Sequence, residues 1–304
     1  MRLRPIFLAL LSLSIVPMLV VCIRAADEIT FEEGIEYSNP DNQHLQLNLA
    51  TPKQAEAKLP AVICIHGGGF RAGDRKDYNG LCKKLAARGY VAATVTYRLS
   101  PKFQFPGAVF DCKAAVRWMK ANAEKYHIDP ERIGVLGGSA GGHLAEFLGV
   151  TGDVPRFEGP RSPGDPSSRV ACVVNYYGPS DFTKSYGKSV DAAVVLPMWL
   201  GGDLKQAYHQ HVLASPLNWV TPDAAPSLLL HGTLDQYVAF EQAVWMRDRL
   251  KACDVEVKLV PLEGAKHGFG GKDAERAEKE AFEFLDAHLK KTSANAAEKA
   301  TAEK

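Results

Sequence analysis

Gly137-Gly138-Ser139-Ala140-Gly141-Gly142 is the stretch that decides the expected fold of this chain. Within it, Gly137-x-Ser139-x-Gly141 fits the G-x-S-x-G nucleophile elbow, in which a serine stands on a sharp turn between a strand and a helix. The required context is present, because the sequence predicts a short strand over 132–136 and a helix over 139–150. Small neighbours relieve the crowding at such a turn, and the helix N-terminus favours negative charge nearby. A glycine-serine loop without chemistry is the alternative interpretation.

Strand-like and helix-like segments alternate on both sides of this stretch, which indicates a mostly parallel sheet with helices on both faces. The expected strands are 29–37, 45–50, 59–66, 90–97, 132–136, 170–177, 227–231 and 255–261. The expected helices are 78–88, 110–124, 139–150, 240–252 and 274–290. The pattern loosens over 152–168 and 178–221, which we expect to be loop excursions over one end of the sheet.

A second glycine-rich motif, His66-Gly67-Gly68-Gly69-Phe70, closes the expected strand 59–66. Consecutive glycines let bare backbone N–H groups face a ligand oxygen, as in the HGGG-type oxyanion loop. A phosphate-binding loop is the alternative. It is disfavoured because no GK[ST] follows and the three glycines do not make GxGxxG.

Two further loops each follow an expected strand and each contain a residue type that a serine nucleophile requires. Asp235 lies in His231-Gly232-Thr233-Leu234-Asp235, and His267 lies in Gly264-Ala265-Lys266-His267-Gly268-Phe269. A serine hydroxyl is a weak nucleophile until a histidine takes its proton, and a carboxylate must orient that histidine. The chain order Ser, Asp, His is one of the known orders of such triads. Ser139, Asp235 and His267 are therefore the candidate catalytic residues.

Two other carboxylates compete with Asp235 for the role of catalytic acid. Asp223 precedes the strand 227–231, and a strand of five residues spans roughly 17 Å, so it would lie at the wrong edge of the sheet. Glu263 lies four residues before His267, in the same loop, and we expect it to face solvent or to cap that loop.

Taken together, the motifs HGGGF, GGSAGGH, HGTLDQYV and GAKHGF resemble those of the hormone-sensitive-lipase-like esterases of the α/β-hydrolase superfamily. The segments 105–118 and 128–133 are also similar to that group, and the resemblance spans roughly 45–289. It is nearer to secreted carbohydrate-esterase-like members, including acetylxylan and feruloyl esterases, than to large lipases. The resemblance implies an α/β fold with a mostly parallel eight-stranded sheet, helices on both faces and a small cap or none.

The same resemblance implies what the site does and what it lacks. It implies an oxyanion hole formed by the N–H groups of Gly68, Gly69 and Ala140, with no metal and no organic cofactor. It implies a serine carboxylic-ester hydrolase that acts through an acyl-enzyme on short-chain esters, with acetyl or feruloyl esters of plant polysaccharide as a natural source. Two departures stand out: Phe70 replaces a common tryptophan, and the usual large N-terminal helical cap is absent. The second argues against long-chain lipase activity.

Other interpretations stay open on the same residues. An arylformamidase-like amidase or an exopeptidase would use the same triad, whereas a non-catalytic binding module would be expected to lack a triad member. Phe70, Tyr177 and Trp199 are candidates for the substrate pocket, with core packing as the alternative. His209-x-His211 is expected in a surface loop rather than in a metal site, because no third ligand is near.

Charge balance and the two chain ends complete the expectations. Thirty-six basic and 35 acidic residues give a net charge of +1, which supplies no electrostatic argument for nucleic acid as a partner. Two arginines precede an apolar run over 6–21, which is typical of a secretory signal peptide. We therefore expect a signal peptide over 1–26, a catalytic domain over 27–291 and a disordered tail over 292–304.

Export to the periplasm or the medium follows from that signal peptide, without stable membrane insertion after cleavage. Lipoprotein processing at Cys22 and an uncleaved N-terminal anchor are the alternatives. The expected partner is a small-molecule or oligosaccharide ester, and the sequence leaves the oligomeric state open. Five cysteines follow Cys22, an odd count that leaves at least one without an intrachain partner.

Overall fold

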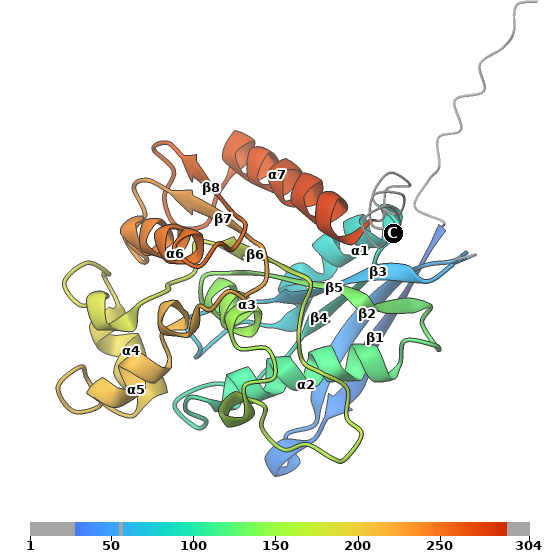
Figure 1. Ribbon diagram of the computed structural model, residues 1–304, viewed down its shortest axis with the longest axis horizontal. Helices are drawn as coiled ribbons and strands as arrows, with labels where there is room; N and C mark the ends of the chain where they lie inside the picture. The colour runs from blue at the N-terminus through green and yellow to red at the C-terminus, as the bar shows by residue number, and fades with distance from the viewer. Residues whose placement is uncertain (1–27, 55–56, 291–304) are drawn as a thin grey trace, which may run out of the picture.

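The computed structural model describes residues 28–54 and 57–290, and within them eight strands form one sheet (Figure 1). The strand order is β1-β2-β4-β3-β5-β6-β7-β8. Strand β2 runs antiparallel to β1 and β4, and every other neighbouring pair is parallel. The mostly parallel eight-stranded sheet expected from the sequence is thus confirmed. The strands are β1 Ile29–Ser38, β2 Leu45–Pro52, β3 Leu59–Ile65, β4 Val91–Val95, β5 Ile128–Gly138, β6 Cys172–Tyr176, β7 Ser227–Gly232 and β8 Val257–Leu262.

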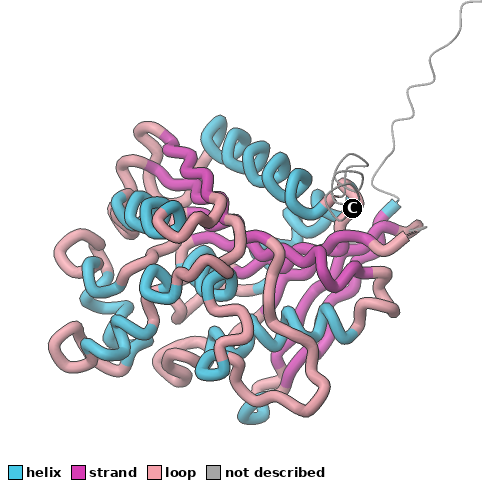
Figure 2. Tube along the Cα trace, viewed as in Figure 1, coloured by secondary structure: helices cyan, strands magenta, loops and turns pink. Residues whose placement is uncertain are grey.

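Helices cover both faces of the sheet, as Figure 2 shows with the magenta strands lying between cyan helices. Alternate residues of β3 face opposite sides: Ile63 and Ile65 join a core cluster with α2 and α3, whereas Val62 and Cys64 join a second one with α1 and α7. Helix α6 packs on the α3 side. The helices are α1 Asn79–Ala87, α2 Gly107–Ala121, α3 Ala140–Val150, α4 Ala192–Leu200, α5 Tyr208–Leu213, α6 Glu241–Lys251 and α7 Gly271–Leu289.

The expected loop excursion over 178–221 is the main difference between the sequence-based expectation and the structure. It contains α4 and α5, which lie together beyond one edge of the sheet and form a small cap (Figure 1). Helix α4 is apolar on nearly every side, with Trp199 buried and Val194 exposed, and it contains Pro197. The polar–apolar period that predicts a surface helix is therefore missing from its sequence.

The two chain ends stay predictions, because the expected signal peptide 1–26 and tail 292–304 lie outside the described residues. Within the described part of the chain, no helix has both the length and the apolar content needed to span a membrane. The five cysteines in that part are all free, and four are buried: Cys64, Cys82, Cys112 and Cys172.

Candidate active site

Ser139 stands between the last residue of β5 and the first turn of α3, with φ 56° and ψ −120°. This left-handed backbone is sparsely populated for a residue with a side chain, and it lifts the hydroxyl above the sheet edge. Its N–H donates to the carbonyl oxygen of Tyr176 at 2.9 Å, which ties the turn to β6. A Cβ atom on Gly141 would overlap the carbonyl oxygen of Ile65, so this position requires glycine.

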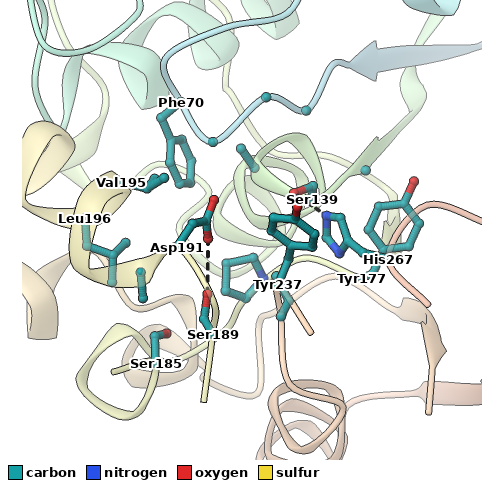
Figure 3. Close-up of a pocket in the computed structure, with 18 of the residues that line it drawn as sticks. Phe70, Ser139, Tyr177, Ser185, Ser189, Asp191, Val195, Leu196, Tyr237 and His267 are labelled. Carbon is teal, nitrogen blue, oxygen red and sulfur yellow. Dashed lines mark hydrogen bonds between the residues drawn. The ribbon is translucent and has the colours of Figure 1, made fainter. Parts of the chain in front are cut away.

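Ser139, His267 and Asp235 are brought together from three different loops. Figure 3 shows Ser139 and His267 side by side. His267 Nε2 lies 2.9 Å from Ser139 Oγ, and its Nδ1 lies 2.7 Å from Asp235 Oδ2. Asp235 follows β7 and His267 follows β8, so parallel strands deliver all three to the carboxyl edge of the sheet. In this geometry Nδ1–H donates to the carboxylate, which leaves Nε2 free to accept the serine proton.

The Asp235 carboxylate is held in its ionised form by the groups around it. Its Oδ1 accepts hydrogen bonds from the backbone N–H groups of Tyr237 at 2.8 Å and Val238 at 2.9 Å. Burial opposes ionisation, but hydrogen bonds from His231, His267 and the backbone outweigh it and hold the pKa of Asp235 below its usual range. An acceptor that stays ionised keeps His267 in one tautomer and one orientation.

His231 supports this arrangement, a role that its sequence motif alone did not indicate. It is fully buried, and its Nε2 lies 2.8 Å from the carbonyl oxygen of Val238 and 3.4 Å from Asp235 Oδ2. Its place at the start of the motif that contains Asp235 was the available signal. The competing carboxylates lie elsewhere: Glu263 is exposed and contacts Thr233, and Asp223 is exposed ahead of β7.

The glycine loop after β3 lies against the serine. Gly68 and Gly69 have φ values of 107° and 59°, and the Gly68 carbonyl closes the turn by accepting from Ala72 N at 3.0 Å. A Cβ atom on Gly67 would lie 3.3 Å from the Cβ of Ser139. Within residues 28–54 and 57–290, no protein acceptor takes the N–H groups of Gly68, Gly69 or Ala140.

The buried side chain of His66 holds the glycine loop in place. Its Nδ1 lies 2.8 Å from the Gly67 carbonyl oxygen, and its ring stacks on Tyr97 with 4.3 Å between centroids. The Tyr97 hydroxyl donates to the His66 carbonyl at 2.9 Å. The loop is therefore fixed by buried groups before any substrate arrives.

A cavity of about 500 Å³ opens beside Ser139, and Phe70 and Tyr177 both line it (Figure 3). Trp199, the third pocket candidate, does not line it. Its side chain is fully buried and stacks face to face on Phe70, with 3.7 Å between ring centroids. The pocket assignment of Trp199 is therefore corrected: helix α4 turns its ring inward, behind Phe70, where the indole supports the pocket wall.

Two other histidines have structural partners. His143 is buried among aromatic rings, its Nδ1 lies 2.9 Å from the Pro179 carbonyl oxygen, and burial lowers its pKa to about 3, so it stays neutral. His211 is not in a surface loop as expected but buried in α5, where its Nε2 lies 3.0 Å from the Tyr186 hydroxyl. Its partner in the motif, His209, is exposed.

Comparison with curated proteins gives esterases as relatives. Esterase LipC of Mycobacterium tuberculosis is 34% identical over 71% of this chain and 55% of its own length. The probable carboxylic ester hydrolase LipM of the same organism is 32% identical over 69% of this chain and 49% of its own. The chain thus spans about half the length of these relatives.

Solved structures with the same fold cover most of this chain. A truncated carbohydrate esterase from gut microbiota superposes with a TM-score of 0.77, at 26% identity, over 88% of this chain and 99% of its own. Esterase 2 of Thermogutta terrifontis, phosphonylated by sarin, has a TM-score of 0.72 at 27% identity, over 84% and 95%.

The family match agrees with these relatives and solved structures. Residues 47–250 match the BD-FAE family, which is more than half of the chain. The predicted resemblance to hormone-sensitive-lipase-like esterases is confirmed by this match together with the esterase relatives. On this evidence the chain belongs to the BD-FAE family and has the α/β-hydrolase fold.

Proposed function

We propose that this protein hydrolyses carboxylic esters, with Ser139 as nucleophile, His267 as general base and Asp235 as the group that orients the histidine. One observation carries the proposal: an unbroken hydrogen-bonded chain runs from the Asp235 carboxylate through His267 to the Ser139 hydroxyl, with contacts of 2.7 and 2.9 Å. The esterase relatives support ester hydrolysis as the reaction.

The first half of the reaction forms an acyl-enzyme. His267 Nε2 takes the proton of Ser139 as Oγ attacks the ester carbonyl carbon. The carbonyl oxygen becomes an oxyanion and accepts hydrogen bonds from the N–H groups of Gly68, Gly69 and Ala140, which have no protein acceptor in the described residues. When the intermediate collapses, the bond to the alcohol oxygen breaks and that oxygen takes the proton from His267.

The second half repeats these steps with water. His267 takes a proton from a water molecule, whose oxygen attacks the acyl carbon, and the resulting oxyanion occupies the same N–H groups. Collapse breaks the bond to Ser139 Oγ, which recovers its proton from His267 as the acid leaves.

Two other functions are less well supported. An amidase or exopeptidase would differ in the leaving group alone, and the esterase relatives favour the ester. A binding module on this fold would not need His267 within 2.9 Å of Ser139.

For the substrate, we propose short-chain esters, with acetyl or feruloyl esters of plant polysaccharide as their natural source. The small cap of α4 and α5 supports this, because buried α4 residues close one end of the 500 Å³ cavity. A solved structure with a similar fold, an acetyl ester-xyloside bifunctional hydrolase from Caldicellulosiruptor lactoaceticus (TM-score 0.72, 25% identity), also supports an acetyl ester as substrate. The signal-like segment 1–26 supports export to the place where such polymers occur.

The nucleophile can be tested by labelling. A fluorophosphonate probe should label the wild-type protein and not Ser139→Ala, because the probe bonds to an activated serine oxygen. The phosphonylated Thermogutta esterase 2 shows that this fold accepts such a reagent. Ser139→Ala should also lose ester turnover, while its circular dichroism spectrum stays that of the wild type. Equal labelling of both proteins would place the nucleophile elsewhere.

Asp235→Asn should lower kcat by about 10⁴ if the serine-protease precedent transfers, because the amide favours the wrong histidine tautomer. Glu263→Gln, in the loop of His267, removes one carboxylate charge in the same way and should stay active. Steady-state rates on a short acyl ester measure both. An active Asp235→Asn beside an inactive Glu263→Gln would reassign the acid.

Gly68→Ala should lower kcat by roughly 10²–10³, the usual cost of losing one oxyanion donor. The new Cβ atom would overlap the Ala72 carbonyl oxygen and displace the loop. Gly89→Ala is the matched control, since Gly89 has a similar φ of 88° but open space around it. It should lose stability, about 1 kcal/mol, and keep its kcat. Loss of kcat in both variants would contradict a special role for the loop.

Turnover should fall with acyl chain length. 4-Nitrophenyl acetate and butyrate should react with a higher kcat/KM than the palmitate, because covering a sixteen-carbon acyl chain needs more apolar surface than the small cap of α4 and α5 supplies. Rates are measured below the critical micelle concentration, so that aggregation of the palmitate ester does not affect the comparison. A palmitate that reacts faster than the butyrate would overturn the short-chain assignment.

A further inference from the structure

Glu146 is a fully buried carboxyl group in the middle of α3, the helix that begins directly after Ser139. Its Oε1 lies 3.1 Å from Ser227 Oγ at the start of β7, and its Oε2 lies 3.4 Å from Asn175 Nδ2 near the end of β6. Among the described residues it has no ion-pair partner, so no cation offsets a charge at this position. A carboxylate without a cation is costly to bury, and a neutral carboxyl is much less so.

The hydrogen atoms available around Glu146 indicate that it is neutral. Ser227 Oγ lies 3.1 Å from Glu146 Oε1 and also 3.1 Å from the Ala225 carbonyl oxygen. A serine hydroxyl has one proton, so an ionised Glu146 and the carbonyl would be two acceptors that share one donor. A protonated Glu146 instead donates to Ser227 Oγ, and Ser227 donates to the Ala225 carbonyl. In agreement, burial raises the pKa of Glu146 to about 7, although the hydrogen bonds with Ser227 and Asn175 lower it.

The ionisable groups around α3 supply no charge to Glu146. Cys64 of β3 and Cys172 of β6 belong to the core on the other face of the sheet. Burial raises the pKa of Cys112 and lowers the pKa of His143, so both are neutral. Glu131 is exposed. The charged groups on α2, β5 and β7 have other partners: Asp111 with Arg98, Lys113 and Arg117 with Glu158, Lys120 with the Arg169 carbonyl, Asp129 with Arg132, and His231 with Asp235.

Asn175 connects Glu146 to the backbone that follows β6. Its Oδ1 accepts from Gly178 N at 2.8 Å while its Nδ2 faces Glu146, so the carboxyl fixes which way the amide points. The amide is packed tightly against the first turn of α3, because a Cβ atom on Gly142 would lie 2.5 Å from Asn175 Oδ1. The position of Gly178 N therefore depends on an amide that Glu146 orients.

The segment 175–178 contacts both the nucleophile and the base. The Tyr176 carbonyl accepts from Ser139 N at 2.9 Å, and the Tyr177 ring lies against the His267 ring with 4.7 Å between centroids. Tyr177 has φ 44°, a left-handed backbone that a bulky residue keeps only where neighbouring contacts hold it. A displacement of this segment would therefore move Ser139 relative to His267.

We propose that Glu146 is a positioning residue that, in its neutral form, holds the segment 175–178 in place behind Ser139 by orienting Asn175. The proposal adds a residue outside the cavity to the proposed ester hydrolysis, and rests on that function for the part of its test that measures turnover. Glu146 touches no substrate, so its effect on the reaction is exerted through Asn175 and the backbone of 176–178.

A pH-dependent contribution to stability follows from the neutral form. The pKa of Glu146 in the folded protein lies above its ordinary value of 4.5, so the folded protein keeps the proton to a higher pH than the unfolded chain does. The stabilising contribution is complete below about pH 4.5 and is lost as the pH rises through about 7.

Thermal unfolding at pH 5 and pH 8 tests the protonation state. Glu146→Gln puts a neutral amide of the same shape in place of the protonated carboxyl, with an NH₂ group for Ser227 and an oxygen for Asn175. Its melting temperature should be close to that of wild type at pH 5 and several degrees higher at pH 8. An equal or lower melting temperature than wild type at pH 8 would overturn the proposal.

Glu158→Gln is the matched control for this measurement. Glu158 is also a buried glutamate, but it is paired with Lys113 at 2.6 Å and Arg117 at 3.0 Å. Removing its charge leaves two buried cations without their partner, so this variant should melt below wild type at both pH values. The opposite signs of the two variants at pH 8 separate a neutral buried glutamate from an ionised one.

Steady-state rates on 4-nitrophenyl acetate test the positioning role. Glu146→Leu and Asn175→Ala should each lower kcat by roughly tenfold to a hundredfold, with a smaller change in KM, because misplaced reacting groups lose rate steeply. The double variant should lose no more than the more impaired single variant, since both act through one amide. Glu146→Gln and Glu158→Gln should keep the wild-type kcat. The rate of fluorophosphonate labelling, which depends on Ser139 and not on an ester, should fall together with kcat.

The outcomes separate this inference from the proposed function. If wild type is active while folded Glu146→Leu and Asn175→Ala keep its kcat, or if Glu146→Gln loses as much kcat as Glu146→Leu, the positioning role is wrong and ester hydrolysis stands. Where Glu146→Leu does not fold, Asn175→Ala and Glu146→Gln decide the same question. If wild type neither hydrolyses the ester nor is labelled at Ser139, the proposed function fails and the positioning role fails with it.

Discussion

The close approach of three backbone segments beneath Ser139 is the constraint on which the site depends. The end of β3, the end of β5 and the first turn of α3 come so near that a Cβ atom on Gly137 or Gly141 would overlap neighbouring carbonyl oxygens. Glycine at these positions lets the chain turn within one residue, and Ser139 takes the strained backbone that results. Because β3 and β5 are adjacent, the same approach places the glycine loop after β3 beside the serine.

Hydrogen bonds to charged and polar groups hold Asp235 and His267 at the same edge of the sheet. Asp235 is buried and accepts two backbone N–H groups in addition to His267, so its charge is stabilised where solvent does not reach. His231 links the same loop to the carbonyl oxygen of Val238. These contacts fix the position of the carboxylate beside His267.

The small cap borders the pocket and packs against the glycine loop. Trp199 of α4 stacks on Phe70 and holds that ring against the cavity, while Asp191 at the other end of the helix faces the cavity. Helix α4 thus borders the cavity, whereas Ser139, Asp235 and His267 lie in the loops that follow β5, β7 and β8.

Sequence alone determined the sheet, its flanking helices and the three loops that hold Ser139, Asp235 and His267, because these rest on local patterns: buried strands, elbow glycines and strand-end motifs. It did not determine α4, whose apolar residues on nearly every side hide the helical period, nor the inward rotation of Trp199. The role of His231 and the orientation of Asp191 were likewise absent from the pattern. They depend on which side chains from distant segments fill the space around each residue, and only the tertiary structure decides that.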